Sequence, residues 1–176
     1  FETNDAYALT VEVSDGDLND QANLAIAVTD VNEAPELANA QATVAENSAN
    51  GTIVTTLAGT DIDAGAALSY AITAGNAAGH FAINADTGVV TVAGPIDFET
   101  NDAYALTVEV SDGDLSDQAN LTIAVSDINE APTMADAQAN VAENAPNGTV
   151  VITLAGNDPD GDDLSYTITA GNQANL

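Results

Sequence analysis

The chain has 176 residues with neither lysine nor arginine, 28 aspartates and glutamates, and a formal net charge of −28. This charge makes nucleic acid and anionic membrane surfaces poor partners, and the absence of cysteine excludes disulfides and thiol chemistry. Because 45% of the residues are hydrophobic, the chain has material for a core, unlike most acidic disordered segments. The sequence has no run of about 18 apolar residues, so it predicts no membrane-spanning segment.

Short strands are the regular elements that the sequence predicts. The alternation from Ile53 to Leu57 is ambiguous, which favours a strand whose phase is shifted by a bulge. Alternating apolar residues predict further strands at Leu68–Ile72 and Phe81–Ile83. The β-branched run Val89–Val92 follows Asp86-Thr87-Gly88, a turn signature, and predicts a fourth strand.

Two further strands follow. Tyr104–Val110 and Leu121–Val125 both alternate apolar with small or polar residues, which is the period of a half-buried strand. About seven short strands in one repeat, with no helical periodicity, predict an all-β fold. We expect a seven-stranded antiparallel β-sandwich.

The chain repeats itself at a spacing of 97 residues. Residues 1–34 return as residues 98–131 with four differences, which are Asn19/Ser116, Ala25/Thr122, Thr29/Ser126 and Val31/Ile128. A unit of this length is large enough to hold its own core, unlike the shorter turns of a solenoid. We therefore expect a window on a tandem array: the C-terminal part of one repeat in 1–34, a complete repeat in 35–131, and the N-terminal part of the next in 132–176.

The joints between repeats carry no flexible linker. Asp30–Ala34 precedes Pro35, and Asp127–Ala131 precedes Pro132, with no glycine or serine in either joint. Flexible linkers are rich in both residues, and proline restricts the backbone. The sequence predicts short, stiff, acidic connections.

Acidic motifs recur near the ends of the expected strands and in the joints. They are Glu46 in Ala-Glu-Asn, Asp61-x-Asp63, Asp97-x-Glu99 and Asp30-x-Asn32-Glu33. Asp and Asn also populate turns for their own hydrogen bonds, so one such motif has a simpler explanation. Four of them in a chain without lysine or arginine favour binding of Ca²⁺, which takes six to eight oxygen ligands.

The same stretches resemble a known family. The stretch VAENSANGTIVTTLAGTDID from Val44, the stretch GHFAINADTGVVTVAGPIDFET from Gly79, and YALTVEVSDGD followed by DINEAP resemble the successive parts of one cadherin-type repeat. The resemblance covers residues 35–131. It implies a Greek-key sandwich with Ca²⁺ ions, usually three, between successive repeats.

The family's ligand roles imply two sets of residues. At the earlier joint they are Glu2, Asp30, Asn32, Glu33, Asp61, Asp63 and Asp112; at the later joint they are Glu46, Asp97, Glu99, Asp127, Asn129, Glu130, Asp158 and Asp160. Where the family has a second Asp followed by Asn, the joints have Glu33-Ala34 and Glu130-Ala131. This difference puts the binding of the ion furthest along the joint in question. The chain also has no tryptophan, so strand-swap adhesion through an N-terminal Trp is not predicted.

These observations predict a structural role rather than catalysis. The chain has one histidine, which cannot serve every repeat, and no nucleophile or phosphate motif accompanies it. Near-identical acidic repeats resemble the extender regions of large bacterial surface adhesins, which implies an extracellular, calcium-rigidified segment in biofilm or cell-surface attachment, with neighbouring repeats as its partners. The alternative is that the repeat itself binds a like module or a surface polysaccharide, against which the 4% aromatic content argues.

Overall fold

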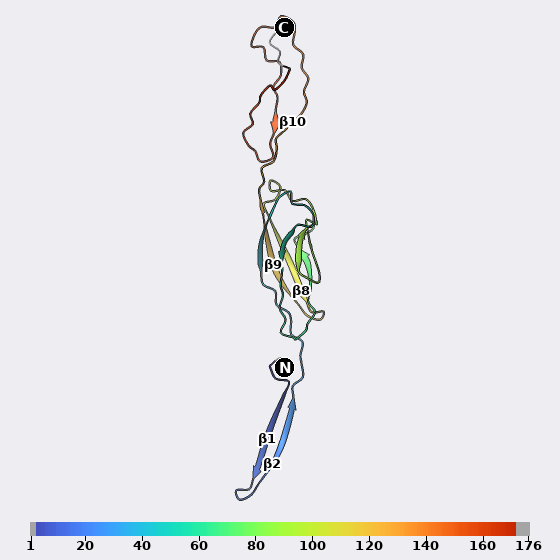
Figure 1. The fold of residues 1–176 in the computed structure, drawn as a ribbon, viewed down its shortest axis with the longest axis vertical. Coiled ribbons are helices and arrows are strands. Elements are labelled where there is room, and N and C mark those ends of the chain that lie inside the picture. The colour runs from blue at the N-terminus through green and yellow to red at the C-terminus, as the bar shows by residue number, and fades with distance from the viewer. Residues whose placement is uncertain (1–2, 172–176) are drawn as a thin grey trace. The chain divides into compact units, whose positions relative to one another are not determined.

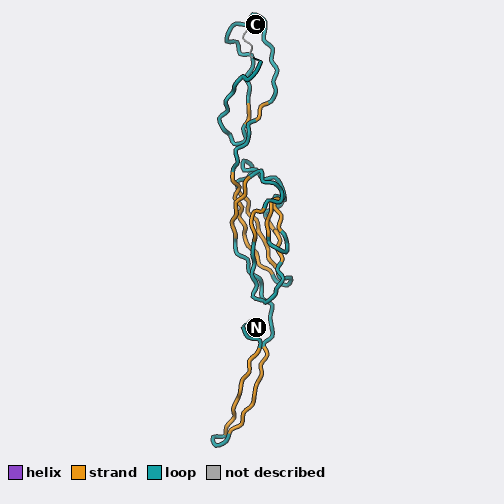
Figure 2. Tube along the Cα trace, viewed as in Figure 1, coloured by secondary structure: helices purple, strands orange, loops and turns teal. Residues whose placement is uncertain are grey.

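The computed structural model describes residues 3–171. It divides into two compact units, Phe1–Ser126 and Asp127–Leu176. Every regular element of the described residues is a strand (Figure 2). Among these residues, no helix has the length and apolar character that crossing a membrane requires. The further boundary between residues 34 and 35 stays a prediction from the repeat.

Seven strands of the first unit form the expected sandwich (Figure 1). They are β3 (Ala40–Ala45), β4 (Ile53–Thr56), β5 (Ser69–Ala74), β6 (Phe81–Ile83), β7 (Val89–Val92), β8 (Ala103–Ser111) and β9 (Ser116–Ser126). One sheet has the order β3-β9-β8-β5 and the other the order β4-β7-β6. The all-β sandwich predicted for this repeat is confirmed.

The core lies between the two sheets and follows the alternation of β8 and β9. Leu106 and Val108 of β8 and Ile123 of β9 are at most 1% exposed, while the residues between them face outward. Phe81 and Val90 close the core from the other sheet. Burial of one face explains why both strands alternate with a period of two.

One strand pair departs from the antiparallel expectation. Strand β3 pairs with β9 in parallel, from Ala40 opposite Leu121 to Ala45 opposite Ser126. All other strand pairs among the described residues are antiparallel. Alternation is the same for a strand read in either direction, so the sequence pattern could not reveal this pairing.

The irregular positions have local causes. The register of β4 shifts between Ile53 and Thr55, which confirms the predicted bulge. In the turn before β7, the side chain of Asn84 accepts the N–H groups of Asp86 and Thr87 at 3.0 Å each. Gly88 then takes a φ of +66°, and a Cβ there would collide with the Leu57 carbonyl oxygen.

The N-terminal segment forms one hairpin, β1 (Ala6–Ser14) with β2 (Asn19–Ala27). Among the described residues, these two strands form a sheet of their own (Figure 1). Its pairing register repeats that of β8 with β9 at a spacing of 97 residues. Tyr7 lies opposite Ile26, and Tyr104 lies opposite Ile123.

The second unit is mostly loop, with β10 (Thr133–Met134) paired to β11 (Gly156–Asn157). It keeps one hydrogen bond of the complete repeat. The Gly156 N–H donates to the Tyr166 hydroxyl oxygen at 2.8 Å, as the Gly59 N–H donates to that of Tyr70 at 2.9 Å. This one hydrogen bond therefore recurs in both places.

Candidate metal centre

The Asp61-x-Asp63 loop of the first unit is held against the joint before Pro35. Glu36 and Thr60 exchange two backbone hydrogen bonds, of 2.7 and 3.0 Å. The Glu33 N–H donates to Asp63 Oδ2 at 3.0 Å, and the Asp63 N–H donates to Asp61 Oδ1 at 2.8 Å. The loop thus wraps around its own two carboxylates and fastens to the joint.

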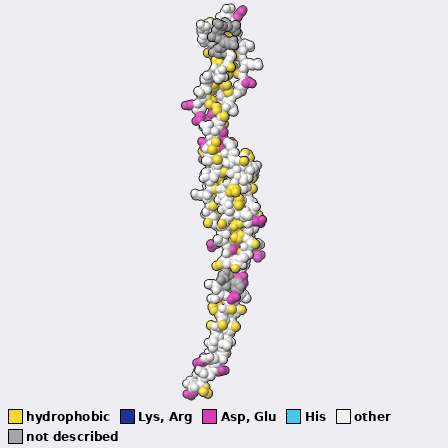
Figure 3. All heavy atoms as spheres, in the orientation of Figure 1, with side chains coloured by type: hydrophobic (Ala, Val, Ile, Leu, Met, Phe, Trp, Pro, Cys, Tyr) yellow, Lys and Arg dark blue, Asp and Glu magenta, His cyan; other side chains and the backbone are white. Residues whose placement is uncertain are grey.

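Each of these carboxylates keeps one oxygen without a hydrogen-bond partner. Asp61 Oδ2 and Asp63 Oδ1 are both buried and unpaired in the structure. Burying such an atom without a partner costs on the order of several kcal/mol. The chain has no lysine or arginine to pair with them (Figure 3), so an external cation fits these two oxygens.

Asp112 reaches the same joint from the loop between β8 and β9. Its Oδ2 accepts the side-chain N–H of Asn32 at 2.8 Å, and its Oδ1 accepts the N–H groups of Asp114 and Leu115 at 2.7 Å each. The Leu115 N–H, then Asn32 and Asp114, hold the pKa of Asp112 below its usual range. The Asp112 carboxylate is therefore ionised. Asn32 donates to it through Nδ2, so the Oδ1 atom of Asn32 is a possible ligand oxygen.

The structure thus connects most of the set predicted for the earlier joint. The Asn32 side chain also donates to the Glu33 carbonyl at 3.3 Å, and with the hydrogen bonds just described this links Asn32, Glu33, Asp61, Asp63 and Asp112. The part played by Asp30, exposed two residues before Asn32, stays a prediction. Glu2 lies outside the described residues.

The second unit repeats this geometry at 97 residues' distance. The Glu130 N–H donates to Asp160 Oδ2 at 2.7 Å, and the Asp160 N–H donates to Asp158 Oδ1 at 3.1 Å. The Asn129 side chain donates to the Glu130 carbonyl at 3.1 Å, as Asn32 does to Glu33 at 3.3 Å. Asp160 Oδ1 is again buried without a hydrogen bond. The arrangement is therefore a property of the motif.

The other candidate ligands of the first unit lie at the end of β3 and in the turn before β8. Glu46 is 3% exposed, and its Oε2 accepts the Phe98 N–H at 2.9 Å. Asp97 accepts both the N–H and the hydroxyl of Thr100, at 3.0 Å each. Glu46 is therefore a buried carboxylate in a chain without lysine or arginine. The ligand roles of Glu46, Asp97, Glu99 and Asp127 stay predictions.

The sequence analysis did not include Asp15, the counterpart of Asp112, among the candidate ligands. The carboxylate of Asp15 accepts the N–H groups of Asp17 and Leu18 at 3.0 and 2.8 Å. These backbone donors, Leu18 first, lower the pKa of Asp15 as their counterparts lower that of Asp112. Asp15 lies 97 residues before Asp112, so the repeat spacing alone would have identified it.

Comparison with known proteins shows which family the sandwich belongs to. Residues 40–126 match the cadherin domain family. Protocadherin Fat 2 of Rattus norvegicus is 32% identical over 194 residues, covering 100% of this chain and 4% of that protein. The protocadherin-like wing polarity protein stan of Drosophila melanogaster is 37% identical over 171 residues, covering 88% of this chain and 5% of that protein. The chain thus spans about one twentieth of the length of these curated relatives.

A solved structure shows the same fold. The protocadherin gammaB7 EC3-6 cis-dimer structure aligns with 90% of this chain and 43% of its own, at a TM-score of 0.66 and 26% identity.

Proposed function

Residues 40–126 form a cadherin domain in a chain of cadherin-type repeats, and from this premise we propose that the chain is a calcium-rigidified extender segment of a large extracellular adhesion protein. Its task would be to hold a distal binding domain away from the cell surface. The observation that carries the proposal is Asp63, whose carboxylate binds the joint's backbone through one oxygen and keeps the other buried and unpaired.

A hard cation such as calcium fits the donor set better than the softer transition metals do. All the candidate ligands are carboxylate, amide or backbone oxygens, which hard cations prefer. The unpaired oxygens of Asp61 and Asp63 would complete their coordination with an ion. At the earlier joint Asp30, Asn32 and Asp112 would join them. The counterparts Asp127, Asn129, Glu130, Asp158 and Asp160, with Glu46, Asp97 and Glu99, would serve the later one.

Rigidity would follow from linkage. The Glu33–Asp63 and Asn32–Asp112 hydrogen bonds fasten the joint at two points without an ion. Ions bound by joint and loops together would favour the one arrangement that completes their coordination. At a calcium concentration of 100 times Kd, such selective binding stabilises that arrangement by about 2.7 kcal/mol. The joint would thereby become stiff.

The wider context of the segment belongs to the proposal too. The near-identical repeats and the absence of cysteine, lysine and arginine support an extender in a bacterial surface adhesin active in biofilm or cell attachment, although the relatives named above are animal proteins. A second candidate function is binding of a like module. The cis-dimer of protocadherin gammaB7 favours this partner over a polysaccharide.

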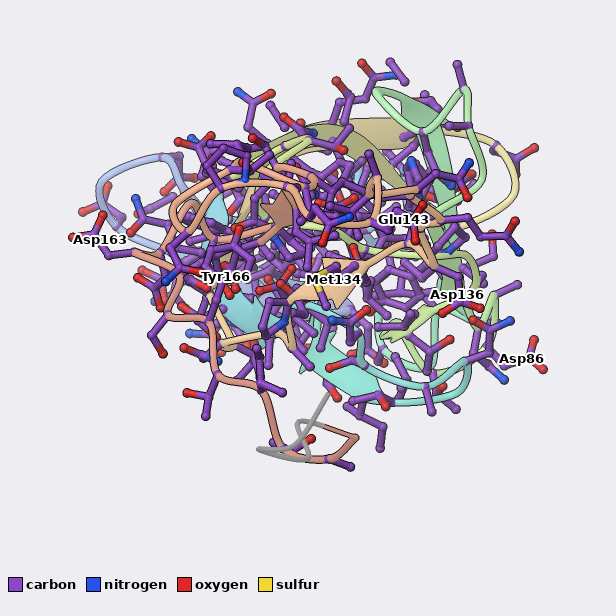
Figure 4. All side chains as sticks on the ribbon, turned by 90° about the horizontal axis from the view of Figure 1, so that it is seen from above. Asp86, Met134, Asp136, Glu143, Asp163 and Tyr166 are labelled. Atoms are coloured by element: carbon purple, nitrogen blue, oxygen red, sulfur yellow. The ribbon has the colours of Figure 1, made fainter. Side chains whose placement is uncertain are left out.

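Isothermal titration of the chain with calcium tests the proposal. We expect binding at micromolar to millimolar concentration, weakened at least tenfold by Asp63→Asn. This substitution keeps an oxygen for the Glu33 N–H and removes one charge. Asp86→Asn is the matched control, because Asp86 is exposed and projects outward (Figure 4). No binding at millimolar calcium would reject the proposal.

A further inference from the structure

The complete repeat contains two Asn-x-Thr motifs, the acceptor pattern of N-linked glycosylation. They are Asn50-Gly51-Thr52, between β3 and β4, and Asn120-Leu121-Thr122, within β9. The first returns after 97 residues as Asn147-Gly148-Thr149, whereas the counterpart of the second, Asn23-Leu24-Ala25, has no threonine. The motif between β3 and β4 is therefore part of the repeat, and the motif in β9 is not.

The first motif lies in a tight turn. The Thr52 N–H donates to the Ala49 carbonyl at 3.0 Å, and Gly51, the third residue of the turn, has a φ of +90°. A positive φ at the third position alone is the geometry of a type II turn, which glycine adopts without strain. Asn50 therefore occupies the second position of the turn, at its corner.

The turn is open to solvent. Asn50, Gly51 and Thr52 are all exposed, and nothing lies within 4 Å of a Cβ placed on Gly51. Among the described residues, none forms a hydrogen bond with the Asn50 side chain. The amide nitrogen of Asn50 is thus available for substitution, and an enzyme can reach all three residues of the motif.

The turn is also anchored independently of the groups that define the motif. The Gly51 N–H donates to the Val92 carbonyl at 2.8 Å, and the Val92 N–H donates to the Thr52 carbonyl at 2.9 Å. Both bonds join backbone groups, so the Asn50 amide and the Thr52 hydroxyl take no part in them. A sugar attached to Asn50 therefore breaks no hydrogen bond of the turn.

The second motif is held inside a sheet. Strand β9 lies between β3 and β8, with Asn120 opposite Thr107 of β8 and Leu121 opposite Ala40 of β3. Leu121, the middle residue of the motif, is 1% exposed. A transferase must hold the backbone of the motif, which is why acceptors lie in surface loops. Asn120 is therefore a poor acceptor in the folded chain, although its side chain is exposed.

We propose that the folded chain is an acceptor of N-linked glycosylation at Asn50 and Asn147, and not at Asn120. In the reaction, Nδ2 of the asparagine bonds to the anomeric carbon of a sugar that carries a diphosphate leaving group. The bond from that carbon to the diphosphate oxygen breaks, and a base of the transferase takes the proton that Nδ2 loses. This role goes beyond calcium binding, because none of these asparagines is a candidate ligand.

The same turn geometry recurs in the second unit. The Thr149 N–H donates to the Pro146 carbonyl at 3.1 Å, and Gly148 has a φ of +87°. Asn147 therefore occupies the same turn position as Asn50. A glycan is bulky and solubilising, so modification would place an uncharged, hydrated group at the same turn of successive repeats.

Transfer of sugar to the purified full chain tests the proposal. One arm uses a soluble N-glycosyltransferase with UDP-glucose, and the other uses a membrane oligosaccharyltransferase with a lipid-diphosphate-linked oligosaccharide. Peptide mass spectrometry locates the sugar. We expect Asn50 and Asn147 to be modified in at least one arm, which identifies the donor, at a rate at least about tenfold above that of Asn120. No sugar on Asn50 in either arm, or equal rates at Asn50 and Asn120, would overturn the proposal.

Two variants and two peptides separate the motif from the fold. Thr52→Ala keeps Asn50 but removes the motif, so Asn50 should no longer be modified while the acceptor of the second unit still is. Thr122→Ala, the matched control in β9, should leave the total amount of sugar unchanged. Isolated peptides of residues 47–54 and 117–124 have no sheet around them and should be modified at similar rates. A preference for Asn50 that persists in the peptides would overturn the selection by the fold.

Discussion

Replacing Asp63 by asparagine should change the stability of the complete repeat in opposite directions with and without calcium. The substitution keeps the shape of the side chain and an oxygen for the Glu33 N–H, a bond of 3.0 Å in the structure. It removes one negative charge beside Asp61, whose Oδ1 accepts the Asp63 N–H at 2.8 Å. The experiment therefore separates the charge of this carboxylate from its role as a hydrogen-bond acceptor.

The magnitude without calcium comes from repulsion. Two carboxylates about 5 Å apart repel by about 3 kcal/mol at an effective dielectric of 20. Asp61 and Asp63 are both half-buried, and screening by solvent and salt reduces this to about 1 kcal/mol. We therefore expect the variant to be more stable than the wild type in chelator, with Tm raised by about 4–8 °C.

The magnitude with calcium comes from the lost ligand charge. The lost attraction to an ion at 2.3–2.6 Å weakens binding by about 2 kcal/mol, or about 30-fold in Kd. At 100 times the wild-type Kd, calcium stabilises the wild type by about 2.7 kcal/mol and this variant by about 1 kcal/mol. The variant then becomes less stable than the wild type by about 1 kcal/mol.

Scanning calorimetry of both proteins, in chelator and in saturating calcium, measures the two differences. Asp86→Asn, an exposed acid outside the motifs, serves as the control and should shift Tm little in either buffer. A stability change of the same sign in both buffers would refute the reasoning. So would calcium failing to raise the wild-type Tm.

Three further outcomes are expected. In a protein of several complete repeats, small-angle scattering should show an extended rod in calcium and a flexible chain in chelator, and an unchanged maximum dimension would contradict this. Asp127→Ala should weaken calcium binding, measured by titration, by a few kcal/mol, because it removes attraction to the ion and leaves the other carboxylates crowded. The control Asp136→Ala should leave the affinity unchanged, and equal affinities of the two variants would show that the site lies elsewhere. Leu106→Ala should lower the free energy of unfolding in urea by about 2–5 kcal/mol, because Leu106 is 1% exposed. Leu9→Ala, the same change at the 46% exposed counterpart, should lower it by less than 1 kcal/mol, and equal losses for the two variants would contradict this reasoning.

Local patterns determined most of the fold. The alternation of β8 and β9 predicted both strands and their buried faces, because one buried side of a sheet imposes a period of two wherever the strand lies. The ambiguous phase between Ile53 and Leu57 indicated a bulge, and the register of β4 shifts there. The 97-residue spacing predicted that the acidic motif would recur, and Asp160 repeats the bond and the buried oxygen of Asp63.

Tertiary structure decided what these patterns leave open. The parallel pairing of β3 with β9 depends on which strand lies beside which, and alternation carries no direction. In sequence, Asp97 belongs to an acidic pair like that of Asp63, yet both oxygens of Asp97 are taken by Thr100 while Asp63 keeps one buried and unpaired. The path of each backbone turn makes that difference.

Burial shows the same limit most directly. Residues 6–14 and 103–111 have identical sequences and form the same strand, yet Leu9 is 46% exposed and Leu106 is 1% exposed. The sequence by itself determined that both segments become strands with one apolar face. Whether that face is covered was decided by the tertiary structure, because hydrophobic burial depends on the strands packed against it.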